Sequence, residues 1–136
     1  MSSLRYPTTE ALKKWVDLLR KDKTLNISLP HTDVVWYAHV ADVIERVTYS
    51  YSPEELHVRA AELFYKIIKA HSHIDGNKRS SIVVVYLFYV LNGMVINNEL
   101  DVRNLAKKVA RSRGRGQHEK WIKKLAEAFE RCTEPL

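Results

Sequence analysis

Residues 71–79 gather side chains that could act together on phosphate groups. The segment reads His71-Ser72-His73-Ile74-Asp75-Gly76-Asn77-Lys78-Arg79. An imidazole can take a proton from an incoming hydroxyl, and such general-base catalysis typically contributes ~10²–10⁴ in rate. A carboxylate beside bound phosphates is a usual ligand of magnesium. The residue types therefore predict His71 as a general base and Asp75 as a ligand of Mg²⁺.

The second half of this segment favours anion binding if a helix begins there. A helix amino terminus offers unpaired backbone N–H groups, and its macrodipole disfavours nearby cations by roughly 0.3–1 kcal/mol each. Lys78 and Arg79 would lie in that first turn, where a bound anion would turn their cost into binding. Gly76 permits a close approach of the ligand, and the Asn77 amide can orient a phosphoryl oxygen. Gly76, Asn77, Lys78 and Arg79 are the predicted phosphate-binding residues.

Each of these residues also has a plain structural explanation when taken alone. Asp75 is a good N-cap for the following helix, and on that basis N-capping is the favoured role for it. His71 suits the negative end of the preceding helix, and Lys78 and Arg79 could simply be solvated. Their joint placement around one helix start favours an active site over coincidence.

The segment that follows is the most hydrophobic of the chain. Residues 82–91 are apolar on every side of a helical projection, which predicts burial all round. Val and Tyr would also suit a central strand, but the length and the Asn92-Gly93 stop favour a helix over residues 77–92.

Five further helices are expected around this central one. Apolar residues at helical spacing predict them after Thr9, over residues 35–47, from Ser52 to about 70, from Asp101 onward, and around Trp121. In the third of these, Ser52-Pro53-Glu54-Glu55 has the pattern of a capping box with Pro at the first helical position. The sequence predicts a single all-α domain over residues 1–136, a bundle around a buried central helix.

Bulk properties limit the class of protein. The chain has 136 residues, 46% of them hydrophobic and 28% charged, as in a soluble globular domain. Its single cysteine, Cys132, allows no internal disulfide and receives no role. No signal sequence or membrane span is expected, so a cytoplasmic protein is predicted.

The formal net charge of +6 favours anionic partners, and part of it lies in the run Arg111-Ser112-Arg113-Gly114-Arg115-Gly116. We favour a solvated loop between two helices over a dedicated nucleic-acid contact through Arg111, Arg113 and Arg115.

Residues 71–79 resemble the signature of the Fic/Doc family: His, any residue, Phe, any residue, Asp or Glu, Gly or Ala, Asn, Gly or Lys, and Arg. Eight of the nine positions are compatible. The resemblance covers most of the chain, from about residue 28 to 131, and implies an all-α fold with transfer of part of a nucleotide from ATP to a protein hydroxyl. It implies that His71 is the base, that Asp75 holds Mg²⁺, that Gly76 and Asn77 form the anion hole, and that Arg79 clamps a phosphate.

The residue between Asn77 and Arg79 distinguishes two branches of the family. Adenylylating Fic enzymes have Gly there and usually a second Arg three residues after the first, whereas this chain has Lys78 and Ile82. In this respect it is similar to the Doc branch, which transfers the terminal phosphoryl group. That branch consists of toxins of toxin–antitoxin pairs that phosphorylate a translation factor, which implies a protein substrate of that kind and a separate antitoxin.

The chain departs from the family in two places. His73 stands where the family has a Phe that packs beneath the loop. The family's inhibitory helix carries Ser or Thr, three residues, Glu, then Gly or Asn, and the nearest match, residues 50–54, is followed by Glu55. We therefore expect no inhibition from within the chain.

Three alternatives stay open. His71, His73 and Asp75 alternate and could bind one transition metal in a hydrolase, although Lys78 and Arg79 would repel an unscreened cation. The same site could transfer AMP. The chain could also be a binding module for nucleic acid without catalysis.

Overall fold

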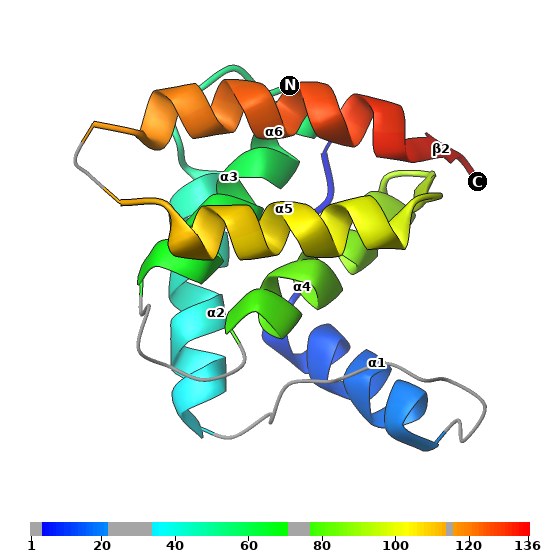
Figure 1. Cartoon of the computed structure of the whole chain (residues 1–136). Coiled ribbons are helices and arrows are strands. Elements are labelled where there is room, and N and C mark those ends of the chain that lie inside the picture. Colours follow the sequence, from blue (N-terminus) through cyan, green and yellow to red (C-terminus); the bar gives the residue numbers. More distant parts are fainter. Residues whose placement is uncertain (1–3, 22–33, 71–76, 114–115) are drawn as a thin grey trace.

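Six helices form most of the part of the chain that the computed structural model describes, which is residues 4–21, 34–70, 77–113 and 116–136 (Figure 1). They are α1 (Thr9–Lys21), α2 (Val34–Thr48), α3 (Leu56–Ala70), α4 (Asn77–Leu91), α5 (Glu99–Arg111) and α6 (His118–Cys132). The predicted all-α bundle is confirmed, and five of the six helices begin within a few residues of their expected positions. No helix among the described residues has the length and apolar character that crossing a membrane requires.

The hydrophobic segment forms α4, so the helical interpretation is correct and the strand interpretation is wrong. α4 packs against α3, α5, α1 and a short strand, which surround it on several sides. Val84, Val85, Phe88 and Tyr89 are fully buried, whereas Leu91 at its end is 37% exposed. The expectation of burial on every side is therefore too strong, because one side of the helix, with Ile82, Tyr86 and Val90, is also only half-buried.

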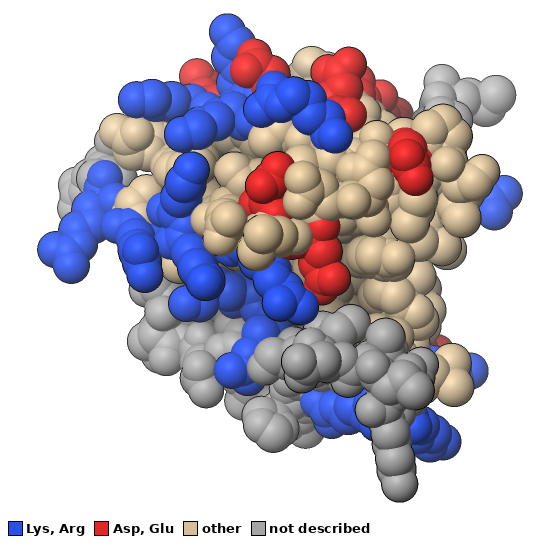
Figure 2. All heavy atoms as spheres, turned by 45° about the vertical axis from the view of Figure 1, so that its right-hand side comes forward, with Lys and Arg blue, Asp and Glu red and all other residues tan. Residues whose placement is uncertain are grey.

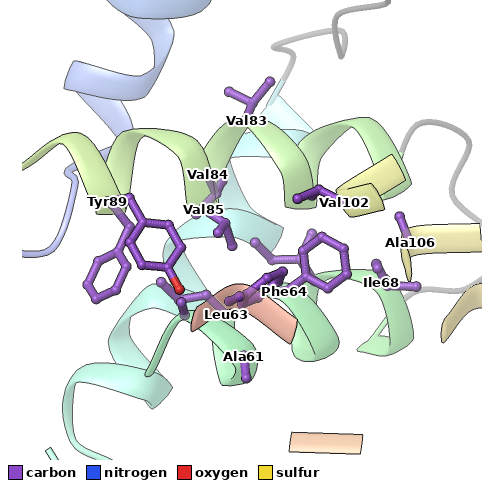
Figure 3. Packing of buried hydrophobic residues seen from close by; sticks show 14 of the residues in the cluster. Ala61, Leu63, Phe64, Ile68, Val83, Val84, Val85, Tyr89, Val102 and Ala106 are labelled. Carbon is purple, nitrogen blue, oxygen red and sulfur yellow. The ribbon is translucent and has the colours of Figure 1, made fainter. Parts of the chain in front are cut away.

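α3 shares the centre of the bundle with α4. It packs against α6, α4, α2 and α5, and its apolar side chains fill the space between these helices (Figure 3). Phe64 of α3 meets Phe129 of α6 edge to face at 5.2 Å between ring centroids. The core therefore forms around a pair of helices rather than around α4 alone.

The start of α3 differs from the prediction. The helix begins at Leu56, and Ser52 and Pro53 lie outside it. The Glu55 carboxylate accepts hydrogen bonds from the backbone N–H groups of His57 and Val58, both at 3.0 Å, so it caps the helix in place of Ser52. The Ser52 hydroxyl instead donates to the buried Glu62, a tertiary contact that competes with the capping box.

A small antiparallel ladder, which the sequence analysis did not predict, joins β1 (Met94–Ile96) to β2 (Thr133–Pro135). Val95 pairs with Glu134 in this register. The turn before β1 uses Gly93 at a φ of 80°, a left-handed conformation that favours glycine. The ladder holds the segment after α4 against the segment after α6.

α5 and α6 lie side by side and run in opposite directions (Figure 1). Asn98 caps α5, because its side chain accepts a hydrogen bond from the backbone N–H of Asp101 at 3.1 Å. The connection between the two helices contains Ser112, Arg113, Gly116 and Gln117 among its described residues. The predicted interhelical connection is thus confirmed at Ser112, Arg113 and Gly116, whereas Arg111 belongs to the last turn of α5 and Gly114 and Arg115 lie outside the described residues.

Candidate active site

The structure describes only part of the predicted site. His71, Asp75 and Gly76, together with His73, lie outside the described residues, so their roles stay predictions. Asn77 is the first residue of α4, and Lys78 and Arg79 follow it in the first turn. The predicted helix start next to the candidate phosphate-binding residues is confirmed.

The first turns of α4 have two different sides. Lys78 and Arg79 are exposed, whereas Ser80 and Ser81 behind them are buried. The Ser81 hydroxyl donates a hydrogen bond to the main-chain oxygen of Lys78 at 2.7 Å. Small hydroxyl residues therefore let the helix start sit close to the core while its cations face outward. Ser80 and Ser81 were not among the predicted site residues, although their position just before an apolar run was a signal.

Within the part of the chain that the structure describes, no carboxylate neutralises the exposed cations of this turn. Neither Lys78 nor Arg79 forms an ion pair there. The helix amino terminus adds a partial positive charge and free N–H groups at the same place. The local electrostatics favour an anionic ligand such as a phosphate group.

The other flank of the predicted site is the end of α3, which two contacts hold in place. The ring Nε2 of the buried His39 donates to the main-chain oxygen of Ile67 at 3.0 Å. The Lys69 ammonium donates to the main-chain oxygen of Ser112, just past α5, at 2.5 Å. Burial lowers the pKa of Lys69 below its ordinary value, because desolvation disfavours the charged amine. α2 and the α5–α6 connection thus fix the chain directly before His71.

Near the amino end of α3, a buried polar network fixes the connection from α2. The Arg59 guanidinium is 4% exposed and donates to the main-chain oxygens of Val47 and Ser52, among others. The Glu62 carboxylate, 2% exposed, accepts from the Ser50 and Ser52 hydroxyls and pairs with Lys66. Apart from the pair of Glu62 and Lys66 within α3, sequence spacing gave no signal for these contacts, because their partners lie outside this helix.

This network also bears on control of the site. Residues 50–54, the nearest match to the family's inhibitory helix, are not helical in the structure. Ser50 and Ser52 are engaged with Glu62 instead. Residues 50–54 therefore differ from the family's inhibitory helix in local structure as well as in sequence.

The described residues offer no alternative metal centre. No group of three or more His, Cys, Asp or Glu side chains in that part of the chain could hold a metal ion. Cys132 is buried, and burial raises the pKa of its thiol. The rival metal site at His71, His73 and Asp75 lies outside the described residues and stays a prediction.

Comparison with known proteins identifies the family. The model of the Fic/DOC family matches residues 6–89, which is more than half of the chain. The chain therefore belongs to the Fic/DOC family. The match starts earlier than the resemblance over residues 28–131 suggested and ends inside α4. Neither the curated proteins nor the solved structures include a match to this chain.

Family membership defines the general chemistry. Fic/DOC proteins are typically transferases that move a nucleotidyl or phosphoryl group onto proteins, with ATP as the substrate and usually with Mg²⁺. The exposed cations at the start of α4 are chemically suited to the phosphates of such a substrate.

Proposed function

We propose that this protein is a Doc-like transferase that moves the terminal phosphoryl group of ATP to a hydroxyl of another protein. The observation that carries the proposal is the combination of residues at two positions of the motif, Lys78 and Ile82. Lys78 is exposed at the start of α4, and Ile82 is half-buried against the hydrophobic core. Adenylylating relatives have Gly and Arg at the corresponding positions of the motif.

The position of Ile82 explains why the two reactions would differ. An apolar side chain that packs against the core cannot bind a phosphate, so the start of α4 offers only the cations of Lys78 and Arg79. A site with one phosphate-binding Arg should hold the nucleotide in a different orientation from the site of the adenylylating relatives, which has two. This favours the Doc-like orientation, in which the terminal phosphoryl group is transferred.

In the proposed reaction, His71 accepts the proton of the acceptor hydroxyl as its oxygen attacks the terminal phosphorus of ATP. The new bond forms between that oxygen and phosphorus, and ADP leaves with the electrons of the broken P–O bond. Gly76, Asn77 and the α4 amino terminus stabilise the phosphoryl oxygens, and Arg79 clamps a phosphate. Asp75 would hold Mg²⁺, which supplies charge neutralisation when bound.

The family resemblance also supports a biological role. We propose that residues 1–136 form one domain that acts in the cytoplasm as the toxin of a toxin–antitoxin pair. The acceptor would be a translation factor, and a separate antitoxin protein would provide the blocking element. The non-helical structure of residues 50–54 supports control from outside the chain, since that segment does not form the family's inhibitory helix.

The fate of the two labelled phosphates of ATP tests the proposal. Purified protein is incubated with a cell extract and with ATP labelled either at the α or at the γ phosphate, and the His71→Ala protein is the control. We expect γ label on one or a few extract proteins and no α label. Transfer of α label would show adenylylation instead. Absence of both labels would reject a transferase.

The metal-dependent hydrolase is distinguished by metal analysis. A hydrolase with His71, His73 and Asp75 as ligands would carry tightly bound zinc or manganese without nucleotide. The proposed transferase should retain no such metal after dialysis, because Mg²⁺ would bind together with the phosphates of ATP.

A further inference from the structure

The carboxyl end of α5 and the residues after it carry a group of exposed cations that the proposed reaction does not use. We define the α5 basic surface as Lys107, Lys108, Arg111 and Arg113, all of them exposed. None of the four forms an ion pair with any other residue that the structure describes. Their charge is therefore available to a partner.

Charge is segregated along α5. Its first turn carries Glu99 and Asp101, and the Arg103 guanidinium is paired with Glu99 at 3.0 Å. Figure 2 shows Lys and Arg side chains gathered in the left part of the view, with Asp and Glu mainly at its centre and top. The macrodipole favours cations in a last helical turn, which accounts for Lys108 and Arg111. It does not account for Arg113, which lies beyond the helix.

The α5 basic surface adjoins the candidate active site. The main-chain oxygen of Ser112, between Arg111 and Arg113, accepts the hydrogen bond from Lys69 two residues before His71. α5 also packs against both α3 and α4, and Figure 1 shows α5 ending on the side where α3 ends and α4 begins. A molecule bound to this surface would therefore lie next to the site of transfer.

We propose that the α5 basic surface docks an acidic segment of the protein that receives the transferred group. The inference rests on the proposed function, because only a protein acceptor needs a docking surface beside the active site. Carboxylates of a short acidic segment complement the four cations of the surface, and such complementarity speeds encounter and fixes orientation.

The size of the surface favours an acidic segment over nucleic acid. Lys107 and Arg111 are one helical turn apart, about 6 Å along the axis. The four cations could neutralise about four phosphates of a duplex, fewer than the roughly 6–10 phosphate contacts of a DNA-binding protein with steep salt dependence. This compact group matches a few carboxylates of one peptide better than a duplex.

Two matched charge reversals test the proposal. The triple variant Lys107→Glu, Lys108→Glu, Arg111→Glu reverses three of the four charges of the surface. The control Lys14→Glu, Arg20→Glu, Lys21→Glu makes the same change in net charge on α1, where all three residues are exposed. The neutral triple variant to Gln on α5 serves as a second test if the reversal prevents folding, which circular dichroism will report.

The probes are a fluorescein-labelled peptide of ten glutamates and a labelled 20-base-pair DNA duplex, followed by anisotropy at low and near-physiological salt. We expect the α5 reversal to weaken peptide binding at least tenfold, the Gln variant to weaken it less, and the α1 control to change it less than twofold. Equal losses in the α5 and α1 variants would mean that only net charge matters and would overturn the proposal. Tighter binding of the duplex than of the peptide, lost with the α5 reversal, would overturn it in favour of nucleic acid.

The transfer assay separates this inference from the proposed function. Normal γ-label transfer by the native protein, with peptide binding that does not depend on α5, would reject the docking surface and leave the function in place. The reverse result, no transfer but α5-dependent binding of the peptide, would reject phosphoryl transfer and restrict the surface to binding an acidic protein.

Discussion

The Lys69 ammonium lies 2.5 Å from the main-chain oxygen of Ser112, and this hydrogen bond joins the end of α3 to the end of α5. The two residues are 43 positions apart in the chain. Lys69 stands two residues before the signature segment, and Ser112 lies between Arg111 and Arg113 of the α5 basic surface. One contact therefore links the support of the proposed base to the proposed docking surface.

Replacing Lys69 should disturb catalysis more than folding. In Lys69→Met the proposed base loses part of its support, so we expect the kcat for phosphoryl transfer to fall about tenfold, since small misplacements are costly in catalysis. The KM for ATP should not change. The free energy of unfolding should change by less than about 1 kcal/mol, because removing a desolvated amine offsets the lost hydrogen bond.

Steady-state kinetics and urea unfolding measure these effects. Lys69→Arg should restore most of the kcat, because it keeps a cationic donor near the Ser112 oxygen. A normal kcat in Lys69→Met would show that Lys69 does not position the base.

Arg79 should lower stability while it promotes ATP binding. In Arg79→Ala the helix amino terminus loses an unfavourable cation, so the free energy of unfolding should rise by about 0.3–1 kcal/mol. Loss of a charged phosphate contact, worth about 1.5–3 kcal/mol, should weaken ATP binding by at least tenfold. Calorimetric titration with ATP and thermal unfolding measure the two effects.

Arg131 in the last turn of α6 provides the matched control. Arg131→Ala removes a cation from the favourable end of a helix and should lower stability slightly with no effect on ATP binding. If Arg79→Ala destabilised the protein and bound ATP normally, Arg79 would have only a structural role.

His71 should matter for transfer and not for folding. We expect His71→Ala to reduce phosphoryl transfer by about 10²–10⁴ while ATP binding persists, since a general base acts on the acceptor hydroxyl. Transfer of γ label to extract protein is the measurement. His118→Ala, at the exposed start of α6, is the control and should keep full activity. Retained transfer in His71→Ala would remove the imidazole from the mechanism.

Asp75 should matter through magnesium. Ser is also a good N-cap residue, so Asp75→Ser should preserve any capping role and keep the thermal stability within about 1 kcal/mol of the native protein. It should nevertheless lose Mg²⁺-dependent transfer, because a hydroxyl replaces the carboxylate. Transfer measured over a Mg²⁺ titration decides this. An active Asp75→Ser protein would mean that the carboxylate only caps the helix.

Alkaline pH should destabilise the fold partly through Tyr89. This residue is fully buried, its hydroxyl lies 2.9 Å from Nδ1 of His57, and burial raises its pKa well above the ordinary value of 10.0. Above about pH 10 the unfolded chain releases this proton and the folded chain keeps it. The free energy of unfolding then falls by about 1.4 kcal/mol per pH unit for this group.

Urea unfolding between pH 8 and pH 11 measures this slope. In Tyr89→Phe the slope should be smaller by that amount, and at pH 8 the variant should be about 1 kcal/mol less stable, because the hydrogen bond to His57 is lost. An unchanged slope would show that Tyr89 does not titrate with unfolding.

The helices could be predicted because their signals are local. The apolar spacing that includes Leu12 and Val16 predicted α1, and the uninterrupted apolar run predicted α4, where the length of the run favoured a helix over a strand. The same local reasoning placed Lys78 and Arg79 in the first turn of α4. These features depend on residues within one or two helical turns of each other.

The features that were missed depend on contacts between distant parts of the chain. The capping box at Ser52 had the correct local pattern, but the hydroxyl is engaged by Glu62 on α3. The pairing of Val95 with Glu134 joins two three-residue strands that are far too short to give a periodic signal. The contact between Lys69 and Ser112 likewise has no counterpart in local spacing.

Arg59 couples the local unfolding of α2 to that of α3. Its guanidinium donates to the main-chain oxygens of Val47 and Thr48, the last two residues of α2, from a position within α3. Carbonyls at a helix carboxyl end ordinarily lack partners, so fraying of α2 there would cost the buried guanidinium two of its acceptors. The two helices should therefore open as one cooperative unit, with an energetic threshold that α2 would not have alone.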